Sequence, residues 1–323
     1  MGFTSLVPPP MTADTKTFLV PAELDGARLD RALVQLATGL SRARVKRAID
    51  EGAVRVDGRP RAKGAIVAQG EVISIEGAAS DDGATPPEPD ASAPLVVLYE
   101  SAQVVVVAKP AGEPTVPLKP RERGTTVNAL LGRYPEMARF GHNPREPGVV
   151  HRLDTETSGA LVAARTEEAF EELRIALKDE ALEKTYLLVC SEEGLADEGR
   201  IDFPLANHPK DQRRVYACIH PRDVMRYQPR PASTSYRVVR RRGPWALVEA
   251  TVHRALRHQL RVHFAAIEHP LAGDELYGGP AAEGLGRHAL HASGVRYAGG
   301  PAVEAFAAEA PLPEDMARLV GAS

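Results

Sequence analysis

The sequence predicts an α+β protein made of two domains of unequal size. A chain of 323 residues is long enough for two domains, each with its own core. Apolar runs of strand length are mixed with stretches that have the periodicity of helices. Residues 77–94 divide the chain, because they are mainly Ala, Ser, Gly, Asp and Pro without periodicity, which is typical of a flexible linker. We therefore expect a small domain over residues 18–76 and a larger one over residues 95–323.

The composition excludes several classes of protein. No segment reaches the roughly 18 consecutive apolar residues of a membrane span, so no membrane partner is expected. Residues 1–17 lack the basic and then apolar regions of a signal peptide and are expected to be a flexible tail. Cys190 and Cys218 belong to no metal-spaced cluster, which fits a reducing, cytoplasmic setting. The formal net charge of -3 argues mildly against a nucleic-acid partner, so any such function depends on how the charge is distributed.

Two helices and a short strand are expected in the small domain. The first helix covers residues 28–36, and Ser41 is a typical N-cap for the second, over residues 42–49. A strand and a turn follow over residues 54–59. Between residues 27 and 63 there are ten Lys or Arg against four Asp or Glu, so positive charge is concentrated here in an acidic protein.

The second of these helices is strongly basic. A run of charge usually indicates a solvated face. However, the order helix, Leu40-Ser41-Arg42, helix and Gly52-x-Val54-x-Val56-x-Gly58 resembles an S4-type RNA-binding domain. S4 domains bind structured RNA mostly through phosphate contacts, so the resemblance assigns four residues to RNA binding: Arg42, Arg44, Lys46 and Arg47.

The larger domain is expected to begin with two strands, residues 95–99 and 104–107. Thr166 is the predicted N-cap of a helix whose apolar stripe packs in the core. Further strands are expected over residues 184–189, 233–239 and 245–252. Between them, residues 207–230 contain several prolines and are expected to be a long loop region suited to RNA contact. The sequence does not indicate which of its basic side chains make contacts: His208, Lys210, Arg213 and Arg214.

A dense polar stretch lies between two short apolar runs near the middle of the chain. Residues 149–150 and 160–164 are apolar and short enough to be buried strands. Residues 151–159 carry one His, one Arg, two carboxylates and three hydroxyls. Polar groups beside an apolar core must be paired there or used there. For an Asp beside an Arg the ordinary interpretation is a turn cap or an ion pair, here Asp154 with Arg152.

The whole string is more specific than its parts. His151-Arg152-Leu153-Asp154 and Thr157-Ser158-Gly159 resemble the H-R-L-D-x-x-T-S-G signature of the RluA-type RNA pseudouridine synthases. Ala108 and residues 254–257 depart from the family pattern, and the second departure bears on substrate positioning more than on chemistry. Further resemblances follow in family order at Lys109-Pro110-Ala111-Gly112, Lys184-Thr185-Tyr186, residues 258–263, residues 269–278 and Leu290-His291-Ala292.

The resemblance implies a catalytic domain with a mixed, mainly antiparallel sheet that isomerises a uridine in RNA to pseudouridine. Asp154 would be the catalytic residue, and three routes stay open: attack on uracil C6, attack on the sugar C1′, or removal of the 2′ proton. Arg261 would pair with this carboxylate. Tyr186 would stack on the base, and a role in moving the final proton stays open. No cofactor or metal is implied, because the uracil ring is itself the electrophile.

The resemblance also implies substrate contacts and a partner. An S4 module ahead of this catalytic domain resembles the large-subunit rRNA modifiers of the family. Structured RNA, and rRNA rather than tRNA, is therefore the expected partner of a protein that we expect to be a monomer. Six further residues would bind the substrate: Lys109, His151, Arg152, Thr157, His258 and Gln259.

Two other kinds of active site fit parts of the sequence. Four histidines between residues 253 and 269 suggest zinc, but histidines five residues apart do not share a helical face, and no H-E-x-x-H pattern or cysteine pair accompanies them. Asp154 and Glu156 suggest glycoside hydrolysis by a carboxylate pair. Aromatic residues make up 5% of the chain, with one Trp, so few aromatic rings are present on which a sugar could stack.

A non-catalytic function is the remaining alternative. An RNA-binding or ribosome-assembly protein could use the S4 domain alone, with an active site that has decayed around residues 254–257. The intact Asp154, Tyr186 and Arg261 argue against such decay.

Overall fold

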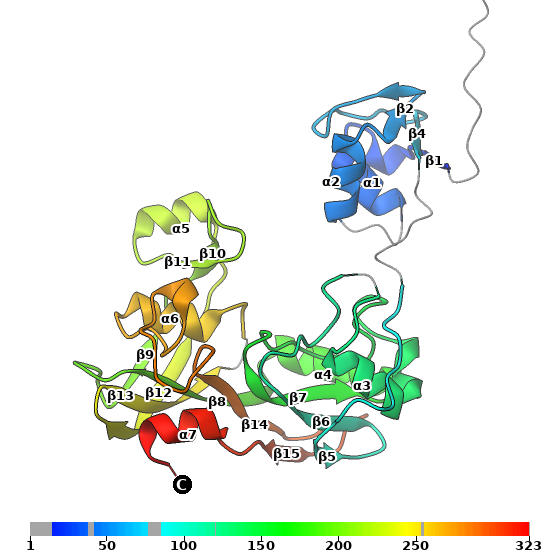
Figure 1. Cartoon of the computed structure of the whole chain (residues 1–323). Coiled ribbons are helices and arrows are strands. Elements are labelled where there is room, and N and C mark those ends of the chain that lie inside the picture. The colour runs from blue at the N-terminus through cyan, green and yellow to red at the C-terminus, as the bar shows by residue number, and fades with distance from the viewer. Residues whose placement is uncertain (1–14, 38–41, 77–84, 120, 253–254, 323) are drawn as a thin grey trace, which may run out of the picture. The chain divides into compact units, whose positions relative to one another are not determined.

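The computed structural model divides into two compact units, which meet in sequence between Thr85 and Pro86 (Figure 1). Each unit has a hydrophobic core of its own. Of the expected tail, residues 1–14 lie outside the described part of the chain, and β1 (Lys16–Leu19) begins just after it. The structure describes residues 15–37, 42–76, 85–119, 121–252 and 255–322.

The smaller unit is a four-stranded antiparallel sheet with two helices, in the strand order β1-β4-β2-β3. Both helices, and the strand at residues 54–56, lie where the sequence predicts them. Apolar side chains from both helices and from the sheet form a single core. The elements after β1 are η1 (Ala22–Leu24), α1 (Leu29–Leu36), α2 (Arg42–Asp50), β2 (Val54–Val56), β3 (Arg59–Pro60) and β4 (Val72–Ile75).

The basic residues of α2 are only partly described. The side chain of Lys46 is exposed and lies 3.5 Å from the carboxylate of Asp50, one helical turn away. The side chains of Arg42, Arg44 and Arg47 lie outside the described residues. RNA binding by this helix therefore stays a prediction.

The larger unit is built on a nine-stranded sheet in the order β5-β6-β7-β14-β8-β13-β12-β9, with β15 paired to β14. Among the described strand pairs, β7 and β14 run parallel and the others antiparallel, which confirms the mixed, mainly antiparallel sheet. The strands are β5 (Val97–Glu100), β6 (Val104–Lys109), β7 (Ser158–Ala164), β8 (Leu182–Ser191), β9 (Glu198–Ile201), β12 (Thr234–Arg242), β13 (Trp245–Val252), β14 (Leu290–Tyr297) and β15 (Phe306–Glu309).

Helices cover this sheet in separate clusters. Successive residues of β6 and β7 enter two different cores, one shared with α3 and α6 and the other with α4. A further helix, α7, packs against β12 and β13 in a third cluster. The bounds are α3 (Thr126–Arg133), η2 (Pro135–Arg139), α4 (Glu167–Lys178), α6 (Gln259–Ala266), η3 (Glu275–Tyr277) and α7 (Glu314–Val320). No helix in the described residues is long and apolar enough to cross a membrane.

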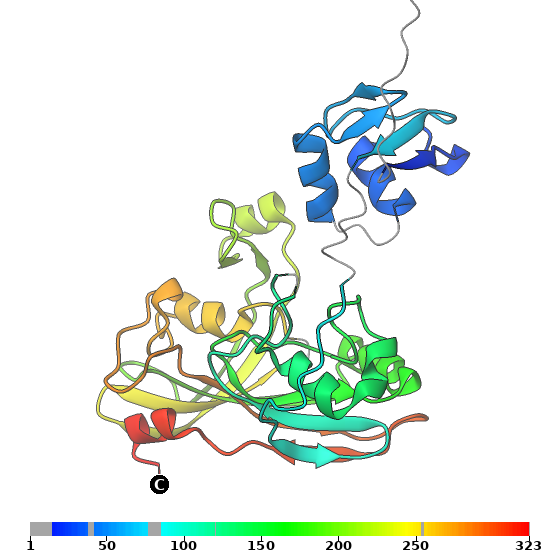
Figure 2. The same ribbon diagram turned by 45° about the vertical axis from the view of Figure 1, so that its right-hand side comes forward.

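The expected loop region of residues 207–230 is instead partly regular. β10 (Leu205–Asn207) pairs with β11 (Val215–Ala217), and α5 (Pro221–Tyr227) follows. Both views show these elements as a lobe that projects from the sheet beyond α6 (Figures 1 and 2). The prediction of a loop was wrong here because each strand is only three residues long, too short for a recognisable pattern.

The predicted linker is too long at its C-terminal end. The backbone N–H of Asp90 donates to Asn128 O at 2.8 Å, and Asn128 Nδ2 donates to Glu88 O at 2.7 Å. Gly132 has no room for a Cβ, because the backbone of Asp90 lies against it. Residues 86–94 therefore dock on α3, although their composition is that of a flexible segment. The predicted linker residues 77–84 lie outside the described part of the chain.

Candidate active site

Asp154 lies on a turn just before β7, and the turn is closed by a bond from Thr157 N to Asp154 O at 3.0 Å. Thr115 fixes the preceding residue, because its hydroxyl donates to Leu153 O at 2.9 Å and accepts from Leu153 N at 3.1 Å. Gly112 N donates to Thr155 O at 2.9 Å. The turn is thus held on both sides, while the Asp154 side chain itself stays 28% exposed.

Lys109 holds this turn and the loop before it through backbone carbonyls. Its ammonium group is 1% exposed and donates to Pro110 O at 2.7 Å, Glu113 O at 2.6 Å and Thr155 O at 3.0 Å. Burial lowers the pKa of Lys109 to about 8. All three N–H groups are used on backbone carbonyls, so Lys109 has none left for a substrate. Its expected role in substrate binding is therefore corrected to support of the Asp154 turn.

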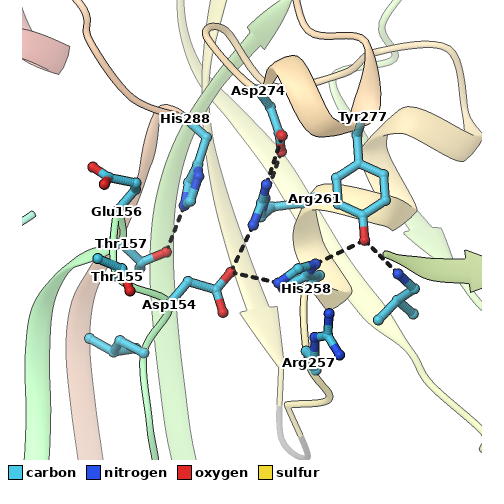
Figure 3. Close-up of polar contacts among 12 residues, drawn as sticks. Asp154, Thr155, Glu156, Thr157, Arg257, His258, Arg261, Asp274, Tyr277 and His288 are labelled. Atoms are coloured by element: carbon cyan, nitrogen blue, oxygen red, sulfur yellow. Dashed lines mark hydrogen bonds and ion pairs between the residues drawn. The ribbon is translucent and has the colours of Figure 1, made fainter. Parts of the chain in front are cut away.

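Arg261 of α6 connects two carboxylates (Figure 3). Its Nε and Nη2 donate to the two oxygens of Asp274 at 2.7 and 2.8 Å, and its Nη1 donates to Asp154 Oδ2 at 3.1 Å. Burial opposes the charge of Arg261, but the hydrogen bonds and charges of Asp274 and Asp154 outweigh it, so the pKa of Arg261 is raised. The guanidinium therefore orients the Asp154 carboxylate through a charge-assisted hydrogen bond.

A second contact to Asp154 comes from His258, whose Nε2 lies 3.7 Å from Asp154 Oδ2. The hydroxyl of Tyr277 accepts a hydrogen bond from Val215 N at 2.8 Å and lies 2.9 Å from His258 Nδ1. The hydroxyl proton is thus free to be donated to Nδ1, and in that tautomer the imidazole proton is on Nε2, facing Asp154. Burial lowers the pKa of His258. His258 is therefore a neutral imidazole beside the carboxylate, at a distance too long for a direct hydrogen bond.

Tyr186 lies on β8 and is 5% exposed. Burial, together with the nearby charge of Asp154, raises the pKa of its phenol. The hydroxyl therefore stays protonated at neutral pH, and the ring lines the cavity that contains Asp154.

The remaining expected substrate residues occupy different environments. His151 Nε2 accepts from Val162 N at 3.1 Å, and burial with the charge of Lys184 lowers its pKa to about 3. Thr157 Oγ1 lies 2.9 Å from His288 Nε2. Arg152 is 61% exposed and pairs with Glu146 at 2.9 Å. All three expected residues line the cavity.

Gln259 also differs from its expected role. Its Oε1 accepts from Leu256 N at 2.9 Å, and its Nε2 donates to Ser233 O at 2.8 Å and to Thr234 Oγ1 at 3.2 Å. The amide is 3% exposed and fully paired, so Gln259 fixes the chain before α6 and leaves no group for a substrate.

The three expected catalytic residues and, apart from Lys109, the expected substrate residues line one cavity of about 970 Å³. Its walls come from the Asp154 turn, the C-terminal half of α4, strands β8 and β13, and the start of α6. Arg213 of the lobe also reaches it. The volume suits a small-molecule-sized group such as a nucleotide.

Sequence reasoning missed several residues of this site. Asp274 and Tyr277 stand in the motif of residues 269–278. The sequence could therefore have indicated both residues, but not the side chains that they contact. Arg287 donates to Glu156 O at 3.2 Å and binds Asp315 of α7, and no sequence signal marked it. Within the described residues, no three His, Cys, Asp or Glu side chains are grouped so that they could hold a metal ion.

Two family models match the chain. Residues 27–73 match the S4 domain, and residues 103–266 match the model described as RNA pseudouridylate synthase, which includes the Asp154 turn and all of α6. The chain belongs to the RNA pseudouridylate synthase family. It is therefore an RNA pseudouridine synthase, an isomerase that converts uridine in RNA to pseudouridine, and RNA is its partner.

Known pseudouridine synthases resemble it over nearly its whole length. The protein named ribosomal large subunit pseudouridine synthase D from Neisseria meningitidis is 34% identical over 314 residues, covering 93% of this chain and 80% of that protein. The protein of the same name from Pasteurella multocida is 36% identical over 315 residues, covering 92% and 91%. An uncharacterized RNA pseudouridine synthase from Synechocystis is 33% identical over 300 residues, covering 91% and 88%.

Solved structures show the same fold. Human RNA pseudouridylate synthase domain containing 1 aligns with a TM-score of 0.54 and 24% identity, covering 69% of this chain and 86% of that one. Human RNA pseudouridylate synthase domain containing 4 aligns with a TM-score of 0.51 and 22% identity, covering 68% and 90%.

Proposed function

We propose that this pseudouridine synthase modifies uridines of large-subunit rRNA and that Asp154 is its nucleophile. The observation that carries the proposal is the Asp154 carboxylate, held 3.1 Å from Arg261 and exposed to a cavity of nucleotide size. The rRNA substrate is supported by the relatives named for the ribosomal large subunit, which resemble the chain across both units. The S4 domain suits such a structured RNA.

The target uridine has to leave its helical stack before Asp154 can reach it. Enzymes that act on a base inside folded RNA extrude that nucleotide into a pocket and stabilise it there. In this enzyme the flipped uracil lies against the Tyr186 ring, with the ribose toward Asp154. Arg152, exposed at the cavity, occupies the place that the base has left or braces the flanking backbone.

Asp154 acts as an ionised carboxylate. Arg261 supplies a charge-assisted hydrogen bond that orients the carboxylate, and the imidazole of His258 lies 3.7 Å from it. The three routes, through uracil C6, through C1′ or through the 2′ proton, all begin from this ionised form. Tyr186 stays protonated and supplies the stacking face. His151 and Thr157 shape the wall beside it.

Replacing Asp154 by Asn tests the nucleophile. The amide keeps the size of the side chain but forms no covalent bond and takes no proton, so Asp154→Asn should abolish pseudouridine formation while RNA binding persists. Pseudouridine is measured on a large-subunit rRNA transcript that the wild type modifies.

Glu156→Gln is the matched control, because Glu156 lines the same cavity two residues away. It should keep turnover, whereas a two-carboxylate mechanism of the glycosidase kind would need both acids. Measurable turnover by Asp154→Asn would show that another residue is the nucleophile.

The choice of RNA has its own test. Pseudouridines are mapped in cellular RNA with and without this gene, and the proposal expects a loss confined to large-subunit rRNA. A loss in tRNA alone would replace rRNA by tRNA as the substrate. A monomeric, cytoplasmic enzyme fits this role, and size-exclusion chromatography with light scattering of the purified protein tests the oligomeric state.

A further inference from the structure

Lys184 is a buried cation in the cavity to which the proposed function gives no role. It lies on β8 two positions before Tyr186, so the two side chains leave the same face of the sheet from Cα atoms about 7 Å apart. Both line the cavity. Lys184 is only 4% exposed.

The ammonium group of Lys184 is unpaired within the described part of the chain. Among the described residues it has neither a hydrogen-bond acceptor nor an ion-pair partner, and burial by itself lowers its pKa to about 8. Lys109 is equally buried but donates to three carbonyls. A buried polar group without a partner is costly, so such a group at a cavity wall points to a ligand that completes it.

Other buried cations near the cavity are already committed. Arg261 uses Nη1 on Asp154 and its other side on Asp274. Arg287 is bound to Asp315 and to backbone carbonyls. Lys184 is thus the buried cation of this site whose charge remains available, within the described residues.

The reaction creates a need for such a charge, whichever route it follows. Attack of Asp154 on C6 forms a C6–O bond and moves the C5–C6 electron pair onto O4. Cleavage of the C1′–N1 bond leaves its electron pair on the uracil ring, shared by N1, O2 and O4. The charge disappears when C5 has bonded to C1′, C5 has lost its proton and N1 has gained one. A fixed cation beside a carbonyl oxygen stabilises either anion as it forms.

We infer that Lys184 is a further catalytic residue, whose ammonium donates to a carbonyl oxygen of the flipped uracil and stabilises the negative charge that develops there. The inference rests on the proposed function of the cavity. Tyr186 contacts the face of the ring, and Lys184, the next side chain on the same face of β8, contacts its edge.

Three variants test this role in single-turnover reactions on a large-subunit rRNA transcript that the wild type modifies. Lys184→Met, which keeps the length without the charge, should lower the rate about 100-fold and change RNA affinity less than about threefold. Lys184→Arg should recover most of the rate. Lys178→Met removes an exposed lysine from the same cavity, at the end of α4, and should weaken apparent affinity without lowering the saturated rate.

The pH profile separates a charged from a packing role. His151 lies close enough to feel the charge of Lys184, and Tyr186, Arg174 and Lys178 line the same cavity. The pKa of His151 is about 3 and that of Tyr186 is raised, so neither titrates between pH 7 and 9. The wild-type rate should fall as pH rises through about 8, where Lys184 loses its proton. Lys109 also has a pKa of about 8 and is present in both enzymes, so the difference between their profiles reports on Lys184. The rate of Lys184→Arg should fall less than that of the wild type as the pH rises.

The outcomes are distinguishable. Product formed at similar rates by Lys184→Met and wild type, or the same alkaline fall in Lys184→Arg as in wild type, would overturn the role of Lys184 alone. No product from the wild type on rRNA or tRNA would overturn the proposed function itself. Thermal unfolding checks that each variant is folded, and Lys184→Gln gives the same test if Lys184→Met unfolds.

Discussion

At the scale of single residues, the site depends on how one guanidinium is divided between two carboxylates. Asp274 is 2% exposed and binds the Nε and Nη2 side of Arg261, which fixes the plane of the guanidinium. With the guanidinium plane fixed in this way, Nη1 points to Asp154. The orientation of the proposed nucleophile is therefore set by a residue that does not touch the cavity.

Replacing Asp274 by Asn should impair both stability and activity. The amide puts a donor opposite an Arg261 N–H and removes a buried countercharge, so the free energy of unfolding should fall by about 3 kcal/mol. The single-turnover rate should also fall, because Asp154 loses its fixed partner. Urea unfolding followed by the fluorescence of Trp245, the one tryptophan of the chain, reports on the larger unit.

Asp315→Asn is the matched control for this prediction. Asp315 also binds an arginine through two oxygens, but its side chain is 27% exposed, so solvent screens the pair. Its loss should cost clearly less stability than that of Asp274. Equal losses would mean that the burial of the Arg261 pair is not what makes it important.

At the scale of elements, α4 joins the core to the cavity. Its first turns pack Ala169, Phe170 and Leu173 into the core, while Leu177 and Lys178 at its other end line the cavity. The helix begins at Thr166, whose hydroxyl accepts from Ala169 N at 3.2 Å. This N-cap and the strand that precedes it were both predicted from the sequence, because capping depends on residues a few positions apart.

Thr166→Ala removes the cap and should lower the free energy of unfolding of the larger unit by about 1 kcal/mol. Thr166→Ser keeps the oxygen and should retain most of that stability. Both are measured by urea unfolding followed by Trp245 fluorescence. A Ser variant as unstable as the Ala variant would assign the loss to the methyl group of Thr166 and not to the hydrogen bond.

At the scale of the whole molecule, chemistry and RNA affinity are assigned to different units. The S4 unit ends before Pro86 and has its own core, while the cavity lies wholly within the larger unit. The positive charge counted over residues 27–63 belongs to the S4 unit. Phosphate contacts give affinity that depends on salt and little sequence selectivity.

Deleting residues 1–85 should weaken binding to structured RNA and flatten its dependence on salt, because fewer counterions are released. Slow modification at high enzyme concentration should persist. Deleting residues 1–94 is an informative companion, since it also removes the segment docked on α3 and should lower stability further. An unchanged salt slope after the shorter deletion would place the main phosphate contacts in the larger unit.

The sequence by itself determined which residue types are present and in which local order. The motifs at residues 151–159, 184–186 and 258–263 are each recognised within a few positions. Together they predicted the reaction class and proposed Asp154, Tyr186 and Arg261 as its catalytic residues. The helices and longer strands could also be predicted from the sequence, because periodicity and capping depend on neighbouring residues. The strands of three residues could not be predicted in this way.

Only the tertiary structure decided what each polar side chain binds. Lys109, Lys184 and Gln259 all stood in motifs, but Lys109 and Gln259 proved to be fully paired and Lys184 unpaired within the described chain. Partners such as Asp154 and Arg261 are 107 residues apart and meet because the Asp154 turn and α6 face the same cavity. Hydrogen bonds and burial depend on which segments become neighbours in space, and no local pattern carries that information.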